Sequence, residues 1–573
     1  MSRRLKSLPA LEGDQRRASD PSAHAALSAS AGTGKTQVLT ARVLRLLLGG
    51  VPPQSILCLT FTKAGAAEMA NRLGERLAAW VRMDDAALSA DLLALDEDVG
   101  PAARMRARRL FARVIEAPGG LRIQTIHSFA QTLLSSFPAE AGIAPGFQSI
   151  EGRAESELAR RTLAALLSEA ETSRNHALLR DVEALSLRLG EGGAVDYLMA
   201  AAKAREAIAA LGSPDEFEAR LRAAMGVEAG DLEARLAEEC RDDQFDCGLL
   251  GRLMEANRVW ATKTGTDIAE RIATWLSATP EERARTLADM ASGIVKKDLE
   301  PNKLRDGDKR VGIEPEYPEL AARLAEVVRR HHELRAAALL AEVQAAGLRA
   351  GAAFAEAYAQ AKRSAGVADF DDLIRWTRAL FDQPGMGDWI RYKLDQRTDH
   401  VLVDEAQDTN ADQWAIVDAM VDEFFSGSPE TEQRRRTLFM VGDFKQAIYS
   451  FQGTDPREFE TYRRSVAERA QAMDLAALES DIAVREFRDL SISASFRSSQ
   501  AVLDVVDALI GTVGHGAMGL PAPPGRHLAF HEARPGMVEL WPPFAPDACG
   551  EVEAGDENWI DEPLRLYADR IAR

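Results

Sequence analysis

The distribution of apolar and polar residues along this chain predicts buried parallel strands joined by helices. Residues 25–28 and 400–403 are short apolar runs, a pattern typical of strands that are covered on both faces. Residues 55–60 predict a further strand. Over residues 36–48 the apolar residues recur at helical spacing, and the pattern stops at Gly49-Gly50. Together these segments indicate an α/β fold.

The middle of the chain has a different pattern. Between residues 129 and 369 it is rich in Ala, Leu, Glu and Arg, and its apolar residues keep helical spacing, as in the long stripe from Leu320 to Ala361. We find no repeat of fixed period in this region. We therefore expect a large all-α insertion within the α/β domain.

The length and composition indicate a globular protein of several domains. With 573 residues the chain is too long for one hydrophobic core, and its 46% hydrophobic and 28% charged residues are ordinary for such proteins. The net charge of −19 argues against indiscriminate binding to nucleic acid but allows a narrow basic channel. We see no signal peptide and no apolar run long enough to span a membrane, and the four cysteines are scattered. We expect a cytoplasmic protein.

The strongest chemical signal lies between the first predicted strand and the first predicted helix. A glycine-containing loop in this context presents backbone N–H groups that can hold phosphates. Lys35 would reach the β- and γ-phosphates of ATP, and the Thr36 hydroxyl would ligate Mg²⁺. Ala29 stands where the loop motif has its first glycine. The residues expected to contact the nucleotide here are Ala29, Ser30, Ala31, Gly32, Thr33, Gly34, Lys35 and Thr36.

Two adjacent carboxylates follow the predicted strand at 400–403. A buried parallel strand would deliver Asp404 and Glu405 at its carboxyl end, where a phosphate loop needs an acidic partner. We expect Asp404 to hold Mg²⁺ and Glu405 to act as the general base on the attacking water. The sequence therefore predicts a P-loop ATPase with ATP and Mg²⁺ as cofactors.

Taken in order, these and four further motifs resemble those of superfamily 1 DNA helicases of the UvrD/Rep type. The further motifs are residues 59–69, 124–129, 437–453 and 494–499. The resemblance implies a RecA-like parallel sheet and ATP hydrolysis coupled to 3′→5′ movement on single-stranded DNA. It also implies that Gln15 reads the adenine base, because a primary amide can pair with adenine N6 and N7 together.

The resemblance assigns roles to residues of the further motifs as well. Gln446 would sense the γ-phosphate, Phe496 would stack on adenine, and Arg497 would reach the γ-phosphate from a second motor domain. Aromatic side chains that stack on bases would grip the DNA strand without reading its sequence. The residues expected to contact DNA are Thr60, Phe61, Thr62, Thr125, His127, Tyr449 and Phe451.

Within the family, the large helical insertion and the particular residues of the motifs resemble the AddA/RecB branch, and they resemble AddA most. That branch comprises helicase subunits of double-strand-break repair complexes, so the resemblance implies single-stranded and double-stranded DNA as substrates and an AddB-type partner. Two closing motifs of the family are not found after Arg497, and we expect the chain to lack the end of the second motor domain and any nuclease domain. The predicted segments are 1–150 (first part of a RecA-like, ATP-binding motor domain), 151–362 (helical insertion), 363–482 (second part of that motor domain) and 483–573 (start of a second RecA-like domain).

Two other interpretations stay open. One is a stand-alone UvrD-like repair helicase, against which a nuclease domain in the complete gene would decide. The other is a non-catalytic ATP-binding or scaffold protein. It is disfavoured because the expected catalytic residues are intact, namely Lys35, Thr36, Asp404, Glu405, Gln446 and Arg497.

Overall fold

The chain forms two compact units, one of Met1–Pro145 with Asp372–Arg573 and one of Gly146–Asp371. The structure is a computed structural model. It describes residues 7–30, 32–305, 307–425, 435–443, 446, 454–478, 486–492, 494–518, 523, 525–541, 567–568 and 571–572. Three residues that the sequence predicts to contact nucleotide or DNA lie outside the described residues, namely Ala31, Tyr449 and Phe451.

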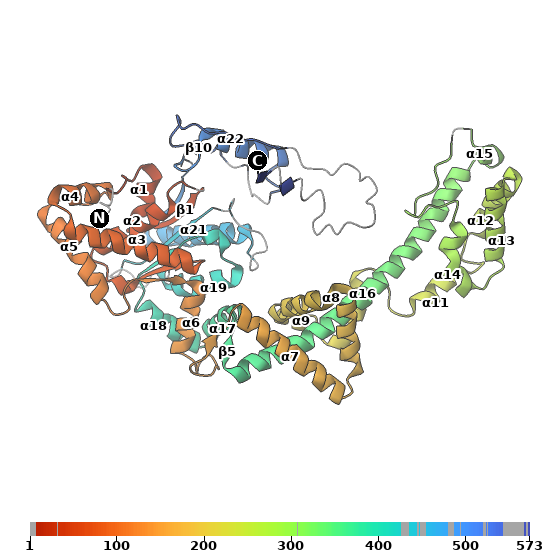
Figure 1. Ribbon diagram of the computed structural model, residues 1–573, viewed down its shortest axis with the longest axis horizontal. Helices are drawn as coiled ribbons and strands as arrows, with labels where there is room; N and C mark the ends of the chain where they lie inside the picture. The colour runs from red at the N-terminus through yellow and green to blue at the C-terminus, as the bar shows by residue number, and fades with distance from the viewer. Residues whose placement is uncertain are drawn as a thin grey trace. The chain divides into compact units, whose positions relative to one another are not determined.

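The first unit is built around a six-stranded parallel sheet (Figure 1). Its strands lie in the order β3-β2-β6-β7-β1-β8, and each pairs in parallel with its neighbours. Because the strands are parallel, the loops that follow them all begin at one edge of the sheet. The strand bounds are β1 His24–Ala29, β2 Ile56–Thr60, β3 Arg122–Thr125, β6 His400–Val403, β7 Thr437–Gly442 and β8 Phe487–Ile492.

The strands form where the sequence has buried apolar runs. Every residue of β2, β6 and β7 is buried, as expected for central strands that are covered on both faces. Side chains on one face, such as Leu27 and Leu402, share a core with helices α2 to α5. The predicted strands at 25–28, 55–60 and 400–403 are confirmed, as is the helix predicted after the phosphate loop.

The remaining elements of the first unit are mainly helices. Along the chain, α1 precedes β1, the first strand of the sheet, and α22 comes after β8, its last strand. Helix α17 begins in the second unit and continues into the first. The bounds are α1 Gly13–Ser19, α2 Lys35–Leu48, η1 Pro53–Ser55, α3 Lys63–Arg82, α4 Asp85–Ala94, α5 Pro101–Glu116, α6 Ile126–Ser136, α17 Phe370–Phe381, α18 Met386–Asp395, η3 Ala406–Asp408, α19 Ala411–Val421, η4 Asp422–Phe425, α21 Pro456–Leu478, β9 Ala494–Ser495, α22 Gln500–Val513 and β10 Leu528–Ala529.

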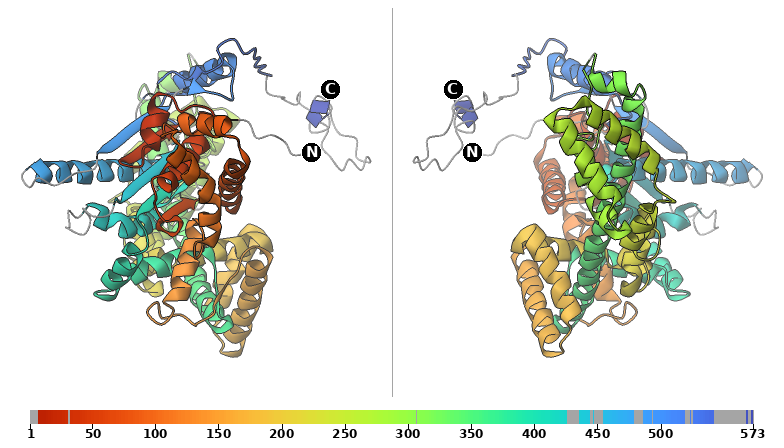
Figure 2. Two further views of the ribbon diagram at one scale, coloured as in Figure 1. Left: turned by 90° about the vertical axis from the view of Figure 1, so that its left-hand side faces the viewer. Right: turned by 90° about the vertical axis from the view of Figure 1, so that its right-hand side faces the viewer.

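The second unit is dominated by helices, and α16 is its central element (Figures 1 and 2). This single helix has 49 residues and contributes Leu324 to one apolar core of the unit and Phe354 to another. None of the helices in the described part of the chain has the length and apolar character needed to cross a membrane. The bounds are β4 Gln148–Ser149, α7 Arg153–Thr172, α8 His176–Lys203, α9 Arg205–Ala210, η2 Pro214–Glu216, α10 Phe217–Ala224, α11 Leu232–Glu239, α12 Cys247–Trp260, α13 Lys263–Leu276, α14 Pro280–Ala291, α15 Lys309–Ile313, α16 Tyr317–Ala365 and β5 Val367–Ala368.

Strand β8 belongs to the same sheet as the strand that carries the phosphate loop. Leu490 of β8 is in register with Leu27 of β1. Residues 487–492, which lie within the segment 483–573 predicted to start a second motor domain, thus pair with the first sheet. The short strand β9 follows and pairs with β10 rather than with this sheet. The predicted domain limits, including the one at residue 483, stay predictions.

Candidate nucleotide-binding site

The loop between β1 and α2 has the backbone geometry of a phosphate-binding loop. Gly32 and Gly34 have φ angles of +77° and +92°, which glycine adopts without steric cost. Gly34 is the N-cap of α2 and has no side chain to cap it, so the first turn of the helix can present its N–H groups to an anion. Thr33 is buried and its hydroxyl donates a hydrogen bond to the Ser30 carbonyl at 2.7 Å, which closes the loop.

Gln15 lies against this loop. It sits on α1, is only 4% exposed, and its Nε2 donates to the carbonyl of Thr33 at 3.3 Å. Its Oε1 accepts from the backbone N–H of Glu12 at 3.4 Å, as part of a capping box at the start of α1. The structure thus brings the predicted adenine-reading amide next to the phosphate loop, while its role in base recognition stays a prediction.

Lys35, Glu405 and Gln446 meet at the carboxyl edge of the sheet, although 370 residues separate the first two. Lys35 Nζ lies 3.0 Å from Glu405 Oε2 and donates to Gln446 Oε1 at 3.5 Å. Gln446 Nε2 donates in turn to Asp443 Oδ2 at 2.6 Å. A continuous network therefore joins Lys35 after β1, Glu405 after β6, and both Asp443 and Gln446 after β7.

The two acidic residues after β6 differ in their electrostatics. Burial raises the pKa of Asp404 to about 6, and the neighbouring charge of Glu405 adds to this effect. Burial also acts to raise the pKa of Glu405, but attraction to Lys35 and hydrogen bonds from Gln407 and Lys35 outweigh it. The pKa of Glu405 therefore lies below its ordinary value, and Glu405 is ionised at neutral pH, as a general base must be.

Phe496 and Arg497 also approach the phosphate loop. The backbone N–H of Phe496 donates to the Gly32 carbonyl at 2.8 Å, and a Cβ at Gly32 would clash with the Cβ of Arg497. The Phe496 ring packs on Phe530, with 4.1 Å between centroids. Arg497 is exposed. Both residues are thus beside the loop, and their predicted contacts with adenine and the γ-phosphate stay predictions.

Five of the seven residues expected to touch DNA are described, and they lie at or just after the ends of two neighbouring strands. Thr60 ends β2 and is in register with Thr125, which ends β3. Thr62 caps α3 by accepting from the Gly65 N–H at 2.9 Å, and Thr125 caps α6 by accepting from the Ser128 N–H at 3.1 Å. Two helix N-termini therefore begin side by side at this edge. Phe61 and His127, the other two predicted contacts among the described residues, lie beside these caps and are half-buried.

Comparison with known proteins identifies the family. The family described as UvrD/REP helicase N-terminal domain matches residues 11–467. The chain belongs to this family. Its α/β fold with a parallel sheet is that of a P-loop helicase, so the resemblance seen in the motifs is confirmed.

Several curated relatives of this UvrD/REP-type chain are named as ATP-dependent helicase/nuclease subunits of the AddA kind. The one from Pelotomaculum thermopropionicum is 26% identical over 95% of this chain and 44% of the relative. The one from Latilactobacillus sakei is 26% identical over 80% of this chain and 51% of the relative. The chain thus spans about half the length of these relatives, or less.

Gln407 is a residue of the site that the sequence analysis did not single out. Its Nε2 donates to Glu405 Oε2 at 2.8 Å and to Asp408 Oδ2 at 3.2 Å, while its Oε1 accepts from the backbone N–H of Asp443 at 2.8 Å. It thereby joins the acidic loop after β6 to the loop after β7. A Cβ at Gly442 would lie 2.8 Å from Gln407 Oε1, so the glycine is needed for this close approach. In the sequence, only its position two residues after Glu405 pointed to a role for Gln407 in the site.

Replacing Gln407 with methionine is expected to slow ATP hydrolysis about 10- to 100-fold while ATP binding changes little. The substitution keeps the length of the side chain but removes the hydrogen bond to the Glu405 carboxylate, and a hydrogen bond to a charged group contributes about 1.5–3 kcal/mol. The measurement is kcat for ATP hydrolysis. The control is Gln413→Met, which removes another buried glutamine that only caps α19. Equal losses in both variants would contradict a specific link through Gln407.

Proposed function

We propose that this chain is the motor part of an ATP-dependent DNA helicase that moves 3′→5′ on single-stranded DNA. The observation that carries the proposal is the network of Lys35, Glu405 and Gln446 at one edge of the sheet. It joins a phosphate-loop lysine, a carboxylate of lowered pKa and an amide from a third loop. The direction of movement comes from the resemblance to the family.

The ion pair between Lys35 and Glu405 suggests how nucleotide would activate the site. A bound γ-phosphate offers Lys35 more negative charge than one carboxylate does, so we expect the ammonium group to move from Glu405 to the phosphate. Glu405 would then be released to accept a proton from the attacking water. Gln446 already contacts Lys35 and Asp443, so its amide would respond to this movement of the Lys35 ammonium.

The oxygen donors near the loop fit Mg²⁺, a hard cation that prefers such ligands. The Thr36 hydroxyl lies in the first turn of α2, and the Asp404 carboxylate follows β6. Burial makes the Asp404 charge unfavourable by itself, which a cation beside it would correct. We propose that these two residues hold the ion, which when bound supplies neutralisation of charge on the phosphate oxygens.

The strand ends of β2 and β3 support a contact with single-stranded DNA. The N-termini of α3 and α6 begin there, and helix N-termini favour phosphate groups. We expect Thr60, Thr62 and Thr125 to contact the phosphate backbone of the DNA. The rings of Phe61 and His127 would stack on its bases. The contacts proposed for Tyr449 and Phe451 rest on the resemblance alone.

We further propose that the chain acts within an AddAB-type complex for double-strand-break repair. The support is the name shared by the relatives from P. thermopropionicum and L. sakei. An AddB-type protein would be the partner, and DNA ends would be the substrate of the whole assembly.

ATP hydrolysis by the 573-residue chain, measured with and without single-stranded DNA, tests the motor function. We expect hydrolysis that depends on Mg²⁺ and rises with DNA.

Phe61→Ala should weaken DNA binding about tenfold or more, because base stacking contributes about 1–3 kcal/mol. The matched control is Phe111→Ala on α5, which removes a partly buried phenylalanine that packs on the core of the same unit. The proposal would be contradicted if DNA did not change the rate of hydrolysis and both variants bound DNA with equal affinity.

A further inference from the structure

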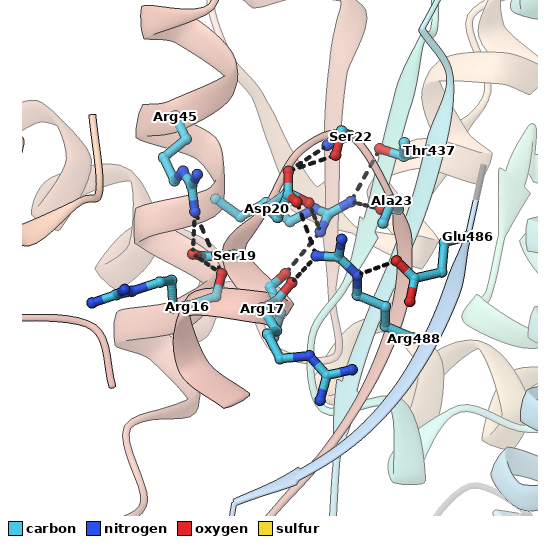
Figure 3. Close-up of polar contacts among 12 residues, drawn as sticks. Arg16, Arg17, Ser19, Asp20, Ser22, Ala23, Arg45, Thr437, Glu486 and Arg488 are labelled. Carbon is cyan, nitrogen blue, oxygen red and sulfur yellow. Dashed lines mark hydrogen bonds and ion pairs between the residues drawn. The ribbon is translucent and has the colours of Figure 1, made fainter. Parts of the chain in front are cut away.

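Three arginines hold the end of the short helix that carries Gln15. Figure 3 labels two of them, Arg45 and Arg488. Helix α1 has seven residues, and a helix so short is not stable by itself. The carbonyl groups of its last turn have no partners within the helix and carry partial negative charge. Arg42, Arg45 and Arg488 supply the missing donors from α2 and β8.

Arg42 is the buried centre of this cluster. It is fully buried, and its guanidinium donates to the carbonyls of Ala18 and Asp20 at 2.8 and 2.7 Å. It also donates to the Ala23 carbonyl and, at 3.2 Å, to the hydroxyl of Thr437 at the start of β7. Burial lowers the pKa of Arg42 to about 9. An apolar side chain could fill this space without that cost, so the arginine is better explained by the groups that it positions.

Arg45 and Arg488 fix the neighbouring carbonyls. Arg45 Nη1 donates to the Ser19 hydroxyl at 2.9 Å and to the Arg16 carbonyl at 3.4 Å, one peptide away from Gln15. Its Nε contacts Glu97 at 3.0 Å. Arg488 Nη1 donates to the Arg17 carbonyl at 3.1 Å. The last turn of α1 is therefore held from two other elements.

The residues that precede α1 are held in place as well. The backbone N–H of Leu8 donates to Asp91 Oδ1 at 2.8 Å, and that of Leu11 donates to the Ala94 carbonyl at 3.2 Å. Asp91 is fully buried and is itself fixed by Trp80 Nε1 at 2.8 Å. Between these two anchors, the position of Gln15 relative to the phosphate loop has little freedom.

The arginines on α2 also relate the base site to the phosphate site. Helix α2 begins at Lys35 and carries Arg42 and Arg45 two and three turns later, about 10–15 Å along the same helix. A single rigid element therefore presents the phosphate loop and sets the position of α1. A base pairs with a primary amide only when donor and acceptor are both aligned, so displacement of α1 would affect adenine recognition more than phosphate binding.

We propose that Arg42 and Arg45 are positioning residues that give the site its selectivity for adenine, acting through Gln15. The proposal rests on the proposed function, because it requires that Gln15 reads the base. The arginines do not touch the nucleotide themselves. They hold the carbonyl end of α1 so that the Gln15 amide meets the base in one orientation.

Binding of ATP and GTP to the full chain, measured by calorimetry with Mg²⁺, tests the proposal. For Arg45→Gln we expect ATP affinity to fall about tenfold and GTP affinity to stay within about twofold. Ser19→Ala removes the acceptor of Arg45 on α1 and should act in the same direction. The matched control is Arg113→Gln, which removes an arginine that donates to the Gly50 carbonyl at 2.8 Å, away from α1. This control should keep the selectivity of the unmodified chain.

A double substitution separates positioning from general damage. If Arg45 acts through Gln15, the Gln15→Ala/Arg45→Gln variant should bind ATP no more weakly than Gln15→Ala alone. Additive losses, or equal losses for ATP and GTP, would overturn the proposal. If Gln15→Ala keeps the ATP preference, the adenine-reading role of Gln15 fails and this inference fails with it. If Gln15→Ala loses the preference and Arg45→Gln and Ser19→Ala keep it, only the inference fails.

Discussion

Replacing Lys35 with alanine is expected to lower the rate of ATP hydrolysis about 10²- to 10³-fold or more, the effect of removing one charge-stabilising donor from an active site. ATP binding should weaken as well. Lys35 lies at the start of α2, beside the loop whose glycines are in left-handed conformations, and its ammonium already contacts both Glu405 and Gln446. Its loss would leave the β- and γ-phosphates without their side-chain cation and would break the contact between the loops after β1 and β6.

The measurement for this variant is the steady-state rate of phosphate release, together with the Kd for ATP. Lys393→Ala is a matched control, because it removes an exposed lysine of the same unit whose ammonium packs on Trp389. Unchanged hydrolysis and ATP affinity in the Lys35 variant would contradict the assignment of the phosphate loop.

Replacing Glu405 with glutamine should separate hydrolysis from binding. The substitution keeps the shape of the side chain but removes the carboxylate that we expect to accept a proton from water. A general base contributes about 10²- to 10⁴-fold to a rate, and hydrolysis should fall by that factor. ATP binding should be retained or become tighter, because Lys35 would no longer be engaged by a carboxylate.

Single-turnover hydrolysis and equilibrium ATP binding are the measurements for this variant. The control is Glu116→Gln at the end of α5, an exposed carboxylate remote in sequence from the acidic loop. If the Glu405 variant hydrolysed ATP at the unmodified rate, Glu405 would not be the base. If both hydrolysis and binding were lost, its main role would be to hold Lys35 in place.

The two variants should differ in ATP binding, and this contrast tests the ion-pair exchange proposed for the site. Lys35→Ala should lose affinity for the phosphates, whereas Glu405→Gln should not. Equal behaviour in binding would mean that the 3.0 Å contact between the two residues is only structural.

The sequence by itself determined the local units that carry the chemistry. A strand, a glycine-containing loop and a helix are consecutive in the chain, so residues 25–48 predicted β1 and α2 without knowledge of any distant contact. The same holds for Asp404 and Glu405, because an apolar run of strand length followed by two carboxylates is a pattern within one short segment. The membership in the UvrD/REP family followed from the order of such local motifs.

Only the tertiary structure decided which of these units meet. Lys35 and Glu405 are 370 residues apart, and their contact depends on the strand order, in which only β7 lies between β1 and β6. The pairing of β8 with β1 was not predicted, because strand pairing joins segments that are far apart in the sequence. In the same way an arginine within a helix gives no local sign of burial, and the role of Arg42 became visible only when three carbonyls and a hydroxyl from other segments surrounded it.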